Sequence, residues 1–334
     1  MSVPTPHPAL PPLDEVLAAM RVVAIPTRTR FRGIEVREAA IFDSPAGASE
    51  FSPFPEYGDS EASAWLAAAL DFGWCEQPPA LRDRIEVNAT VPAVAAEDVR
   101  GILKRFPGCR TAKVKVAERG QTLADDVARV RAVRDAMGPD ARVRVDANGG
   151  WSVDEAEAAL RALAAFDLDY AEQPSATVPE LVELRARDIG VRIAADESVR
   201  KAEDPLAVAR SGAADLLIIK AQPLGGVGRA LAVVAEAGLP VVISSALDTS
   251  VGISMGLHLA AALPDGALAG ACGLGTVALL DGDVTSDPLV PAGGAIDLRR
   301  PALDAALLER FRADPERDAW WRDRVARCHR ILTA

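Results

Sequence analysis

From residue 85 onward, short runs of aliphatic and β-branched residues alternate with longer segments in which apolar residues recur every three or four positions. The first pattern is typical of buried strands and the second of helices that pack on one face. The runs begin 23 to 30 residues apart, at 85–89, 112–116, 142–146, 169–172, 192–196, 216–220, 240–244 and, more weakly, 267–271. Eight strand–helix units in succession predict a closed (β/α) barrel.

An open, doubly wound sheet would also alternate strands with helices. Such a sheet usually carries a glycine-rich phosphate-binding turn after its first strand, whereas the segment 88–92 reads Asn-Ala-Thr-Val-Pro. Helix boundaries fit the barrel pattern as well. Ser152, followed three residues later by Glu155, forms the capping box that begins one of the expected helices.

Before residue 85 the pattern is different. Two strands, at 22–25 and 33–41, flank a basic turn, and a helix follows at 60–72, which together predict a small α+β module. We therefore expect an N-terminal domain at 1–84 and a barrel at 85–289. A C-terminal segment at 290–334, with a helix near 304–311, is expected to pack back on the N-terminal domain.

The chain is acidic. It has 48 Asp and Glu against 37 Lys and Arg, a net charge of −11, which argues against a nucleic-acid partner. An anionic substrate is still compatible, because a bound cation can reverse the field inside one pocket. The four cysteines lack metal-ligand spacing, and no apolar leader or membrane-length window is present. We expect a cytoplasmic protein without a membrane partner.

Charged side chains stand at the ends of consecutive predicted strands, where the active face of a barrel lies. Asp146, Glu172 and Asp196 end the third, fourth and fifth strands. Three converging carboxylates repel one another unless a cation neutralises them. Oxygen-only ligands favour Mg²⁺, which Mn²⁺ can replace, and zinc is disfavoured because no His or Cys joins the set.

Lysines flank these carboxylates on both sides. The second strand ends in Lys113-Val114-Lys115, and the sixth ends in Lys220. Lys115, beside Lys113 and near a dication, is expected to have a lowered pKa and to act as a base. Lys220 would face it across the metal, an arrangement that suits proton abstraction next to a carboxylate.

The order Lys-x-Lys, Asp, Glu, Asp, Lys on successive strands resembles the enolase superfamily. The resemblance covers nearly the whole chain and implies a (β/α)7β TIM-like barrel under an N-terminal α+β capping domain that the C-terminal segment completes. The two lysine strands are similar to those of the muconate-lactonising subgroup. Mandelate racemase relatives use a His–Asp pair late in the barrel, and none of the three histidines here ends a predicted strand.

Within this subgroup, several segments resemble the actinobacterial o-succinylbenzoate synthases. They are 31–33, 50–54, 87–90, 244–252 and 273–276. The turn before Glu50 departs from the usual glycine-rich form and reads Gly47-Ala48-Ser49. The resemblance implies a lyase that dehydrates a small anionic cyclohexadiene carboxylate, 2-succinyl-6-hydroxy-2,4-cyclohexadiene-1-carboxylate, to 2-succinylbenzoate in menaquinone biosynthesis.

The same resemblance implies a role for each charged residue. Lys115 removes the ring proton next to the carboxylate and then protonates the departing hydroxyl. Lys220 keeps its charge over the ring face, a cation–π contact. The carboxylates hold Mg²⁺, and the residues expected around these ligands are Lys113, Arg144 and Asn148.

Two further sets are expected to bind substrate. The basic turn, with Arg28 and Arg32, would close over an anionic substrate, although a solvated hairpin turn gives the same pattern. Hydroxyls and backbone N–H groups would bind the succinyl carboxylate, from Ser245, Thr249, Ser250, Gly252 and Gly273. The alternative for 245–252 is a loop that leads into a helix expected at 254–262.

Other functions remain compatible with these residues. An N-succinylamino acid racemase needs a base on each face of its substrate, which Lys115 and Lys220 would also supply. A muconate cycloisomerase is a further alternative. A dipeptide epimerase is disfavoured because the segment 269–273 has no carboxylate for a substrate ammonium. A non-catalytic binding barrel is disfavoured because the chain has a complete set of candidate bases and metal-binding carboxylates.

Overall fold

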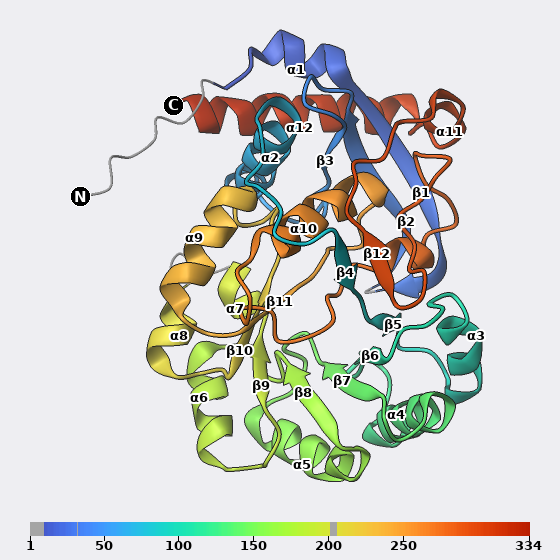
Figure 1. Ribbon diagram of the computed structural model, residues 1–334, viewed down its shortest axis with the longest axis vertical. Helices are drawn as coiled ribbons and strands as arrows, with labels where there is room; N and C mark the ends of the chain where they lie inside the picture. The colour runs from blue at the N-terminus through green and yellow to red at the C-terminus, as the bar shows by residue number, and fades with distance from the viewer. Residues whose placement is uncertain (1–9, 32, 201–205) are drawn as a thin grey trace.

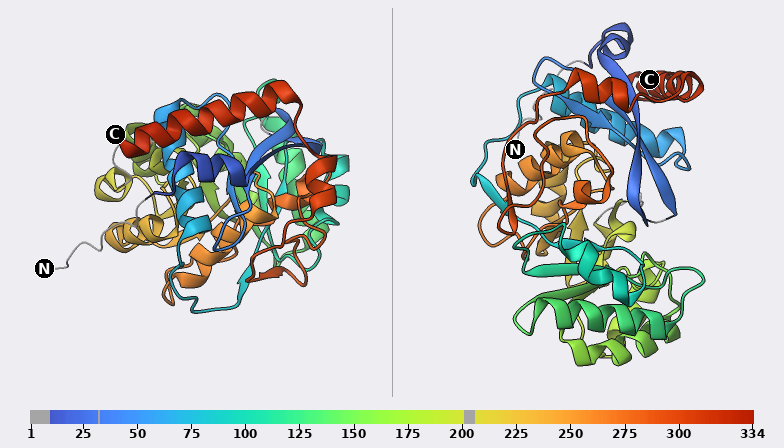
Figure 2. Two further views of the ribbon diagram at one scale, coloured as in Figure 1. Left: turned by 90° about the horizontal axis from the view of Figure 1, so that it is seen from above. Right: turned by 90° about the vertical axis from the view of Figure 1, so that its right-hand side faces the viewer.

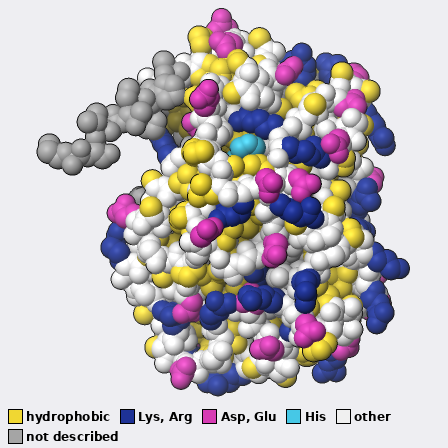
Figure 3. All heavy atoms as spheres, viewed as in Figure 1, with side chains coloured by type: hydrophobic (Ala, Val, Ile, Leu, Met, Phe, Trp, Pro, Cys, Tyr) yellow, Lys and Arg dark blue, Asp and Glu magenta, His cyan; other side chains and the backbone are white. Residues whose placement is uncertain are grey.

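The computed structural model describes residues 10–31, 33–200 and 206–334. Two layers stand one above the other: a barrel of parallel strands below, and a capping layer built from both ends of the chain above (Figure 1). Acidic and basic side chains are interspersed on the face drawn in Figure 3, so the negative net charge is not gathered into one patch there. In the described ranges no helix is long and apolar enough to cross a membrane.

Seven parallel strands form the barrel sheet, in the spatial order β11-β10-β9-β8-β7-β6-β5. Their bounds are β5 (Ala89–Val91), β6 (Thr111–Lys115), β7 (Arg142–Asp146), β8 (Leu168–Glu172), β9 (Ile193–Ala195), β10 (Leu216–Ile219) and β11 (Val241–Ile243). Because all of these strands pair in parallel, their carboxyl ends meet at one rim. The predicted barrel is confirmed.

The eighth position is filled by a segment that is not a continuous strand. Single parallel bridges join Val241 to Leu268 and Ser244 to Gly273 on one side, and Val87 to Cys272 on the other. Gly270, with φ of +139°, interrupts the extended backbone between these bridges. The run expected at 267–271 therefore closes the barrel without forming a regular strand.

Helices cover the outside of the barrel and follow the strands in alternation (Figure 1). They are α3 (Val99–Leu103), α4 (Leu123–Met137), α5 (Val153–Leu163), α6 (Val178–Ala186), α7 (Glu197–Arg200), α8 (Ala207–Ser211), α9 (Val227–Ala237) and α10 (Ser250–Ala262), with short 3₁₀ turns η1 (Ala96–Asp98), η2 (Ala164–Phe166) and η3 (Thr276–Leu279). The capping box of Ser152 and Glu155 is present at the start of α5. The helix α10 begins at Ser250, four residues before its expected start, because Thr249 caps it.

The first predicted strand is divided in two. β4 (Arg84–Glu86) pairs antiparallel with β12 (Ala295–Asp297), outside the barrel, and only β5 joins the barrel sheet. Asn88, which lies between them, donates its backbone N–H to Cys272 O at 2.9 Å. The expected strand 85–89 was therefore wrong in its extent: the chain changes partner within it.

The capping layer consists of an antiparallel sheet covered by helices. Its strands are β1 (Met20–Phe31), β2 (Ile34–Phe42) and β3 (Ser49–Phe51), and its helices are α1 (Leu13–Ala19), α2 (Asp59–Trp74), α11 (Ala305–Arg310) and α12 (Pro315–Thr333). The β1–β2 hairpin reaches down towards the barrel, and α12 crosses the top of the layer (Figure 2). Trp321 of α12 packs edge-on against Phe51, with ring centroids 5.7 Å apart, and its indole N–H donates to Glu38 at 2.9 Å.

Candidate active site

A cavity lies where the carboxyl ends of the barrel strands meet the capping layer. Two aromatic residues cover it from the capping side, Phe31 at the end of β1 and Phe54 after β3. The barrel contributes the remaining lining, which consists of Thr90, Lys113, Lys115, Asp146, Asn148, Asp196, Lys220, Ser244, Ser245, Ala246, Gly273 and Thr276. Charged groups from four strand ends therefore share one enclosed space.

Strand register explains why these side chains meet. Lys115 lies opposite Asp146, and Asp146 lies opposite Glu172, on adjacent parallel strands. Residues directly opposite each other in a sheet point to the same face. Asp196 follows the end of β9 and Lys220 the end of β10, so both point into the same rim.

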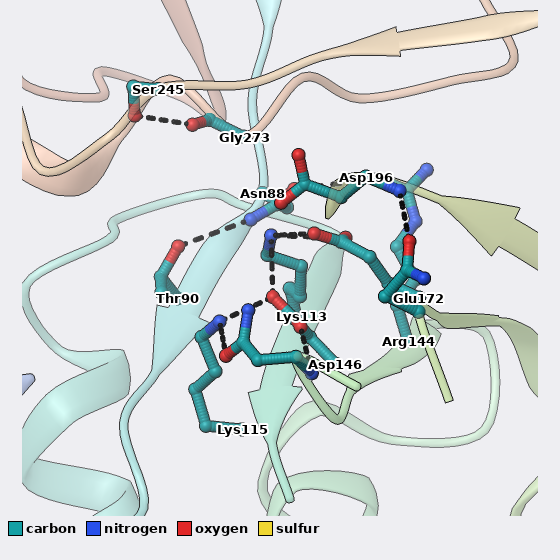
Figure 4. Close-up of polar contacts among 12 residues, drawn as sticks. Asn88, Thr90, Lys113, Lys115, Arg144, Asp146, Glu172, Asp196, Ser245 and Gly273 are labelled. Atoms are coloured by element: carbon teal, nitrogen blue, oxygen red, sulfur yellow. Dashed lines mark hydrogen bonds and ion pairs between the residues drawn. The ribbon is translucent and has the colours of Figure 1, made fainter. Parts of the chain in front are cut away.

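Each of the three carboxylates of this rim is in contact with a lysine. Lys115 Nζ lies 2.5 Å from Asp146 Oδ2, and Lys220 Nζ lies 2.5 Å from Asp196 Oδ2. Lys113 stands between two carboxylates, 3.1 Å from Asp146 Oδ2 and 2.9 Å from Glu172 Oε1 (Figure 4). The structure thus brings together the two lysines and three carboxylates predicted as catalytic and metal-binding residues, with Lys113 in contact with two of the carboxylates.

The pKa values of the charged groups in the rim are shifted by burial and by the neighbouring charges, which often act in opposite directions. Burial raises the pKa of Glu172 to about 8, and the neighbouring charge of Asp146 adds to this rise although Lys113 opposes it. Burial would also raise the pKa of Asp146, but Lys115 and Lys113 hold it well below its usual range. Burial lowers the pKa of Lys113, and the attraction of Glu172 and Asp146 more than reverses that effect. Negative charge is therefore only partly compensated at Glu172.

The donor set fits a hard divalent cation. Asp146, Glu172 and Asp196 offer oxygen atoms alone, and each side chain is at most 1% exposed. In the described part of the chain, no three His, Cys, Asp or Glu side chains already form a compact ligand cluster, and lysine ammonium groups stand beside each carboxylate. These carboxylates could hold a cation once the lysine contacts rearrange.

Asn148 and Arg144 differ in their relation to this site. Asn148 accepts a hydrogen bond from Lys115 Nζ at 2.6 Å and takes a left-handed backbone with φ of +48°. Arg144 instead binds Asp169 at 2.9 Å and lies over the ring of Tyr170, deeper in the barrel. We expect Arg144 around the metal ligands; its guanidinium contacts Asp169 rather than the carboxylates themselves, and its place around them stays a prediction.

The residues expected to bind the succinyl group also separate into two sets. Ser245 and Gly273 line the cavity, and the Ser245 hydroxyl donates to Gly273 O at 2.9 Å (Figure 4). Thr249 and Gly252 instead bind Glu50 of the capping layer, and the Ser250 backbone N–H donates to Asp283 at 3.2 Å. These three residues lie at the start of α10, and Gly252 also lines a small cavity beside Lys220, so their binding of the succinyl group stays a prediction.

Of the two arginines expected to close over the substrate, Arg28 is among the described residues and Arg32 lies outside them. Arg28 Nε donates to Leu280 O at 2.8 Å and lies 3.7 Å from Asp281, with half of its side chain exposed. The structure thus places Arg28 against the segment that follows η3, on the outside of the rim, and not in the lining of the cavity.

Residues outside the predicted set complete the cavity. The Phe31 ring centroid lies 5.3 Å from Lys115 Nζ, and Thr276 shares a hydrogen bond with Ser245 at 2.8 Å. Phe54 and Thr90 line the cavity as well. Aromatic residues in the otherwise polar segment around Phe54 were the available sequence signal, but only the folded chain shows that they cover the lysines.

Comparison with known proteins decides the family. The family model described as enolase C-terminal domain-like matches residues 95–302, and the one described as enolase N-terminal domain-like matches residues 22–73. The o-succinylbenzoate synthase of Mycolicibacterium smegmatis is 56% identical over 324 residues, which cover 97% of this chain and 99% of that protein. The chain belongs to the o-succinylbenzoate synthases of the enolase superfamily.

Further comparisons agree with this membership. The o-succinylbenzoate synthase of Mycobacterium tuberculosis is 54% identical over 326 residues, with 97% of this chain and 98% of that protein covered. The crystal structure of 2-chloromuconate cycloisomerase from Rhodococcus opacus matches with a TM-score of 0.74 at 22% identity, covering 89% of this chain and 98% of that one. At that identity the likeness concerns the fold alone, and it confirms the capped barrel expected for an o-succinylbenzoate synthase.

Proposed function

We propose that the protein catalyses the dehydration of 2-succinyl-6-hydroxy-2,4-cyclohexadiene-1-carboxylate to 2-succinylbenzoate, a step of menaquinone biosynthesis. Membership among the o-succinylbenzoate synthases at 54–56% identity supports this reaction over racemisation. The observation that carries the chemistry is the pair of buried lysines, Lys115 and Lys220, on either side of a buried carboxylate set.

Lys115 is the proposed base. Asp146 Oδ2 and Asn148 Oδ1 both accept hydrogen bonds from its Nζ, so they orient the amine and stabilise the ammonium that forms. The neutral amine takes the proton from the ring carbon that bears the carboxylate. The electron pair of that C–H bond forms a ring double bond, the C–O bond to the hydroxyl breaks, and the ammonium returns a proton to the oxygen as water leaves.

Lys220 is proposed to keep its charge throughout. Its ammonium is held by Asp196 at 2.5 Å, on the opposite side of the rim from Lys115. A cation beside the ring stabilises the negative charge that develops when the proton leaves. Phe31 and Phe54 exclude water from this space, which strengthens the electrostatic effect.

Asp146, Glu172 and Asp196 are the residues that would hold a divalent cation, Mg²⁺ in our proposal. When bound, the ion supplies positive charge beside the substrate carboxylate. The residues 1–84 and 290–334 would act together as a cap over a catalytic barrel at 85–289. In this division Ser245 and Gly273 lie where the succinyl group would bind, next to Thr276.

The test uses the purified protein with Mg²⁺ and the cyclohexadiene substrate, followed by the ultraviolet absorbance of the aromatic product. We expect turnover by the wild-type protein, a loss of at least ~10²–10⁴-fold for Lys115→Ala, and no loss for Lys104→Ala, an exposed lysine on the same barrel. N-succinylamino acids, followed by optical rotation, should racemise far more slowly. Absence of aromatic product from the metal-loaded wild type would overturn the proposal, and equal kcat/KM on both substrates would make the enzyme bifunctional.

A further inference from the structure

The backbone around Lys115 is held by two side chains of α4. Arg129 Nη1 donates to the carbonyl oxygen of Lys115 at 2.8 Å, and the backbone N–H of Ala117 donates to Asp126 Oδ2 at 3.0 Å. Asp126 and Arg129 pair with each other at 2.9 Å, one helical turn apart. The point at which the chain leaves β6 is therefore clamped on both sides of Val116.

Arg129 extends this clamp to two neighbouring segments. Its Nε donates to Val94 O at 2.6 Å, in the connection that follows β5, and its Nη2 donates to the side chain of Gln121. Gln121 in turn donates to Ala93 O at 2.8 Å. One guanidinium thus fixes the end of β6 relative to the connection after β5, the strand next to it in the barrel.

Stability alone does not account for a charged pair at this place. The side chains of Asp126 and Arg129 are at most 3% exposed, and burial raises the pKa of Asp126. Desolvation of a buried ion pair offsets most of its attraction, so apolar residues of similar volume would stabilise the barrel as well. In addition, Ala117 has a left-handed backbone with φ of +58°, a conformation that is unfavourable for alanine and that the clamp maintains.

We propose that Asp126 and Arg129 are positioning residues that place the amine of Lys115 for proton abstraction. They act through the backbone of the lysine, since neither lines the cavity. The proposal rests on the function proposed above for Lys115. A shift of about 1 Å in a reacting group can cost ~10²-fold in rate, so a loosened strand end should lower kcat while substrate binding is retained.

The chain offers a matched control on the same helix. Arg134 also donates to backbone carbonyl groups, Ala141 O at 2.6 Å and Phe166 O at 2.6 Å, but these lie at the opposite end of the barrel, before β7 and β8. The experiment compares Arg129→Lys and Asp126→Asn with Arg134→Lys. For each variant it measures kcat, KM, the midpoint of thermal unfolding, Mg²⁺ affinity by titration, and amide hydrogen exchange of a peptide spanning 111–121.

We expect Arg129→Lys and Asp126→Asn to lower kcat by ~10- to 100-fold, with KM and Mg²⁺ affinity within about 3-fold of wild type and faster exchange at Ala117. Arg134→Lys should lower the unfolding midpoint but leave kcat and exchange at 111–121 unchanged. The proposal is overturned if Arg129→Lys keeps wild-type kcat while folded, or if Arg134→Lys loses kcat equally. Failure of the wild type to dehydrate the substrate would contradict the proposed function and not this proposal. Unchanged hydrogen exchange at Ala117 in Arg129→Lys would show that Arg129 does not hold the backbone at the end of β6, whichever reaction the enzyme catalyses.

Discussion

Glu50 joins the capping layer to the barrel, and its ionisation should make the stability of the protein depend on pH. The side chain is fully buried. Its Oε2 accepts hydrogen bonds from the Thr249 hydroxyl at 2.5 Å and the Gly252 N–H at 3.0 Å, and its Oε1 accepts one from Ser52 at 2.6 Å. Burial, together with the charge of Asp248, raises the pKa of Glu50 to about 7 from an ordinary value of 4.5.

The sign and size of the effect follow from this difference. Between pH 4.5 and 7 the folded protein holds a proton on Glu50 that the unfolded chain has released. The free energy of unfolding therefore falls as the pH rises through this interval. One pKa unit corresponds to 1.36 kcal/mol, so Glu50 alone should remove about 3 kcal/mol of stability between pH 4 and pH 8.

Urea unfolding of wild type and Glu50→Gln at pH 5 and pH 8 measures this contribution together with its coupling to Asp248, because the titrating groups that do not interact with Glu50 cancel in the comparison. The fall in stability from pH 5 to pH 8 should be smaller in the variant by at least ~1 kcal/mol. Glu38→Gln is the matched control with the opposite sign. Burial would raise the pKa of Glu38, but the hydrogen bonds that it accepts from Arg317 and Trp321 lower it. The stability that ionised Glu38 contributes is therefore lost as the pH falls. An unchanged pH dependence in Glu50→Gln would refute the reasoning.

Three further predictions concern the site and the cap. Lys220→Arg keeps its cation and should retain more activity than Lys115→Arg, whose guanidinium is no base at neutral pH; steady-state rates of the folded, metal-loaded variants decide this, and the reverse order would exchange the two roles. Chelation should abolish turnover until Mg²⁺ or Mn²⁺ is restored, and full activity after exhaustive chelation would contradict the metal dependence. Asp196→Asn should bind Mg²⁺ more weakly, as measured by calorimetric titration. Trp321→Ala should lower the free energy of unfolding by about 3–5 kcal/mol, because it empties a fully buried aromatic site, and a loss below ~1 kcal/mol in urea unfolding would show that the cap does not depend on this contact.

The barrel and its charged rim could be predicted because both depend on local patterns. Hydrophobic runs at regular spacing located the strands, and the rule that parallel strands end at one rim brought Asp146, Glu172 and Asp196 together. The division of the first strand into β4 and β5 could not be predicted, because the partner of β4 is β12, about 200 residues later in the chain.

Thr249 and Gly252 show a second limit of the sequence. A hydroxyl and a flexible backbone N–H suit a substrate carboxylate and a protein carboxylate equally well. Their actual partner, Glu50, is 199 residues away from Thr249 in sequence. Arg144 shows the same limit, since alternation places it on the inward face of β7 but does not reveal that Asp169 lies within reach.

The contact between α12 and the β1–β3 sheet has a consequence for how the protein is made on the ribosome. The sheet is synthesised first and the barrel second, but the sheet lacks the part of its cover that α12 supplies until Trp321 can pack on Phe51 and Arg317 can pair with Glu38. All the carboxylates and lysines of the rim emerge before that moment, while the carbonyl of Phe54 gains its hydrogen bonds from Arg324 of α12 only when α12 docks. A nascent chain therefore carries its charged rim before the capping layer is complete, and α12 adds the contact that supports Phe54 over the site.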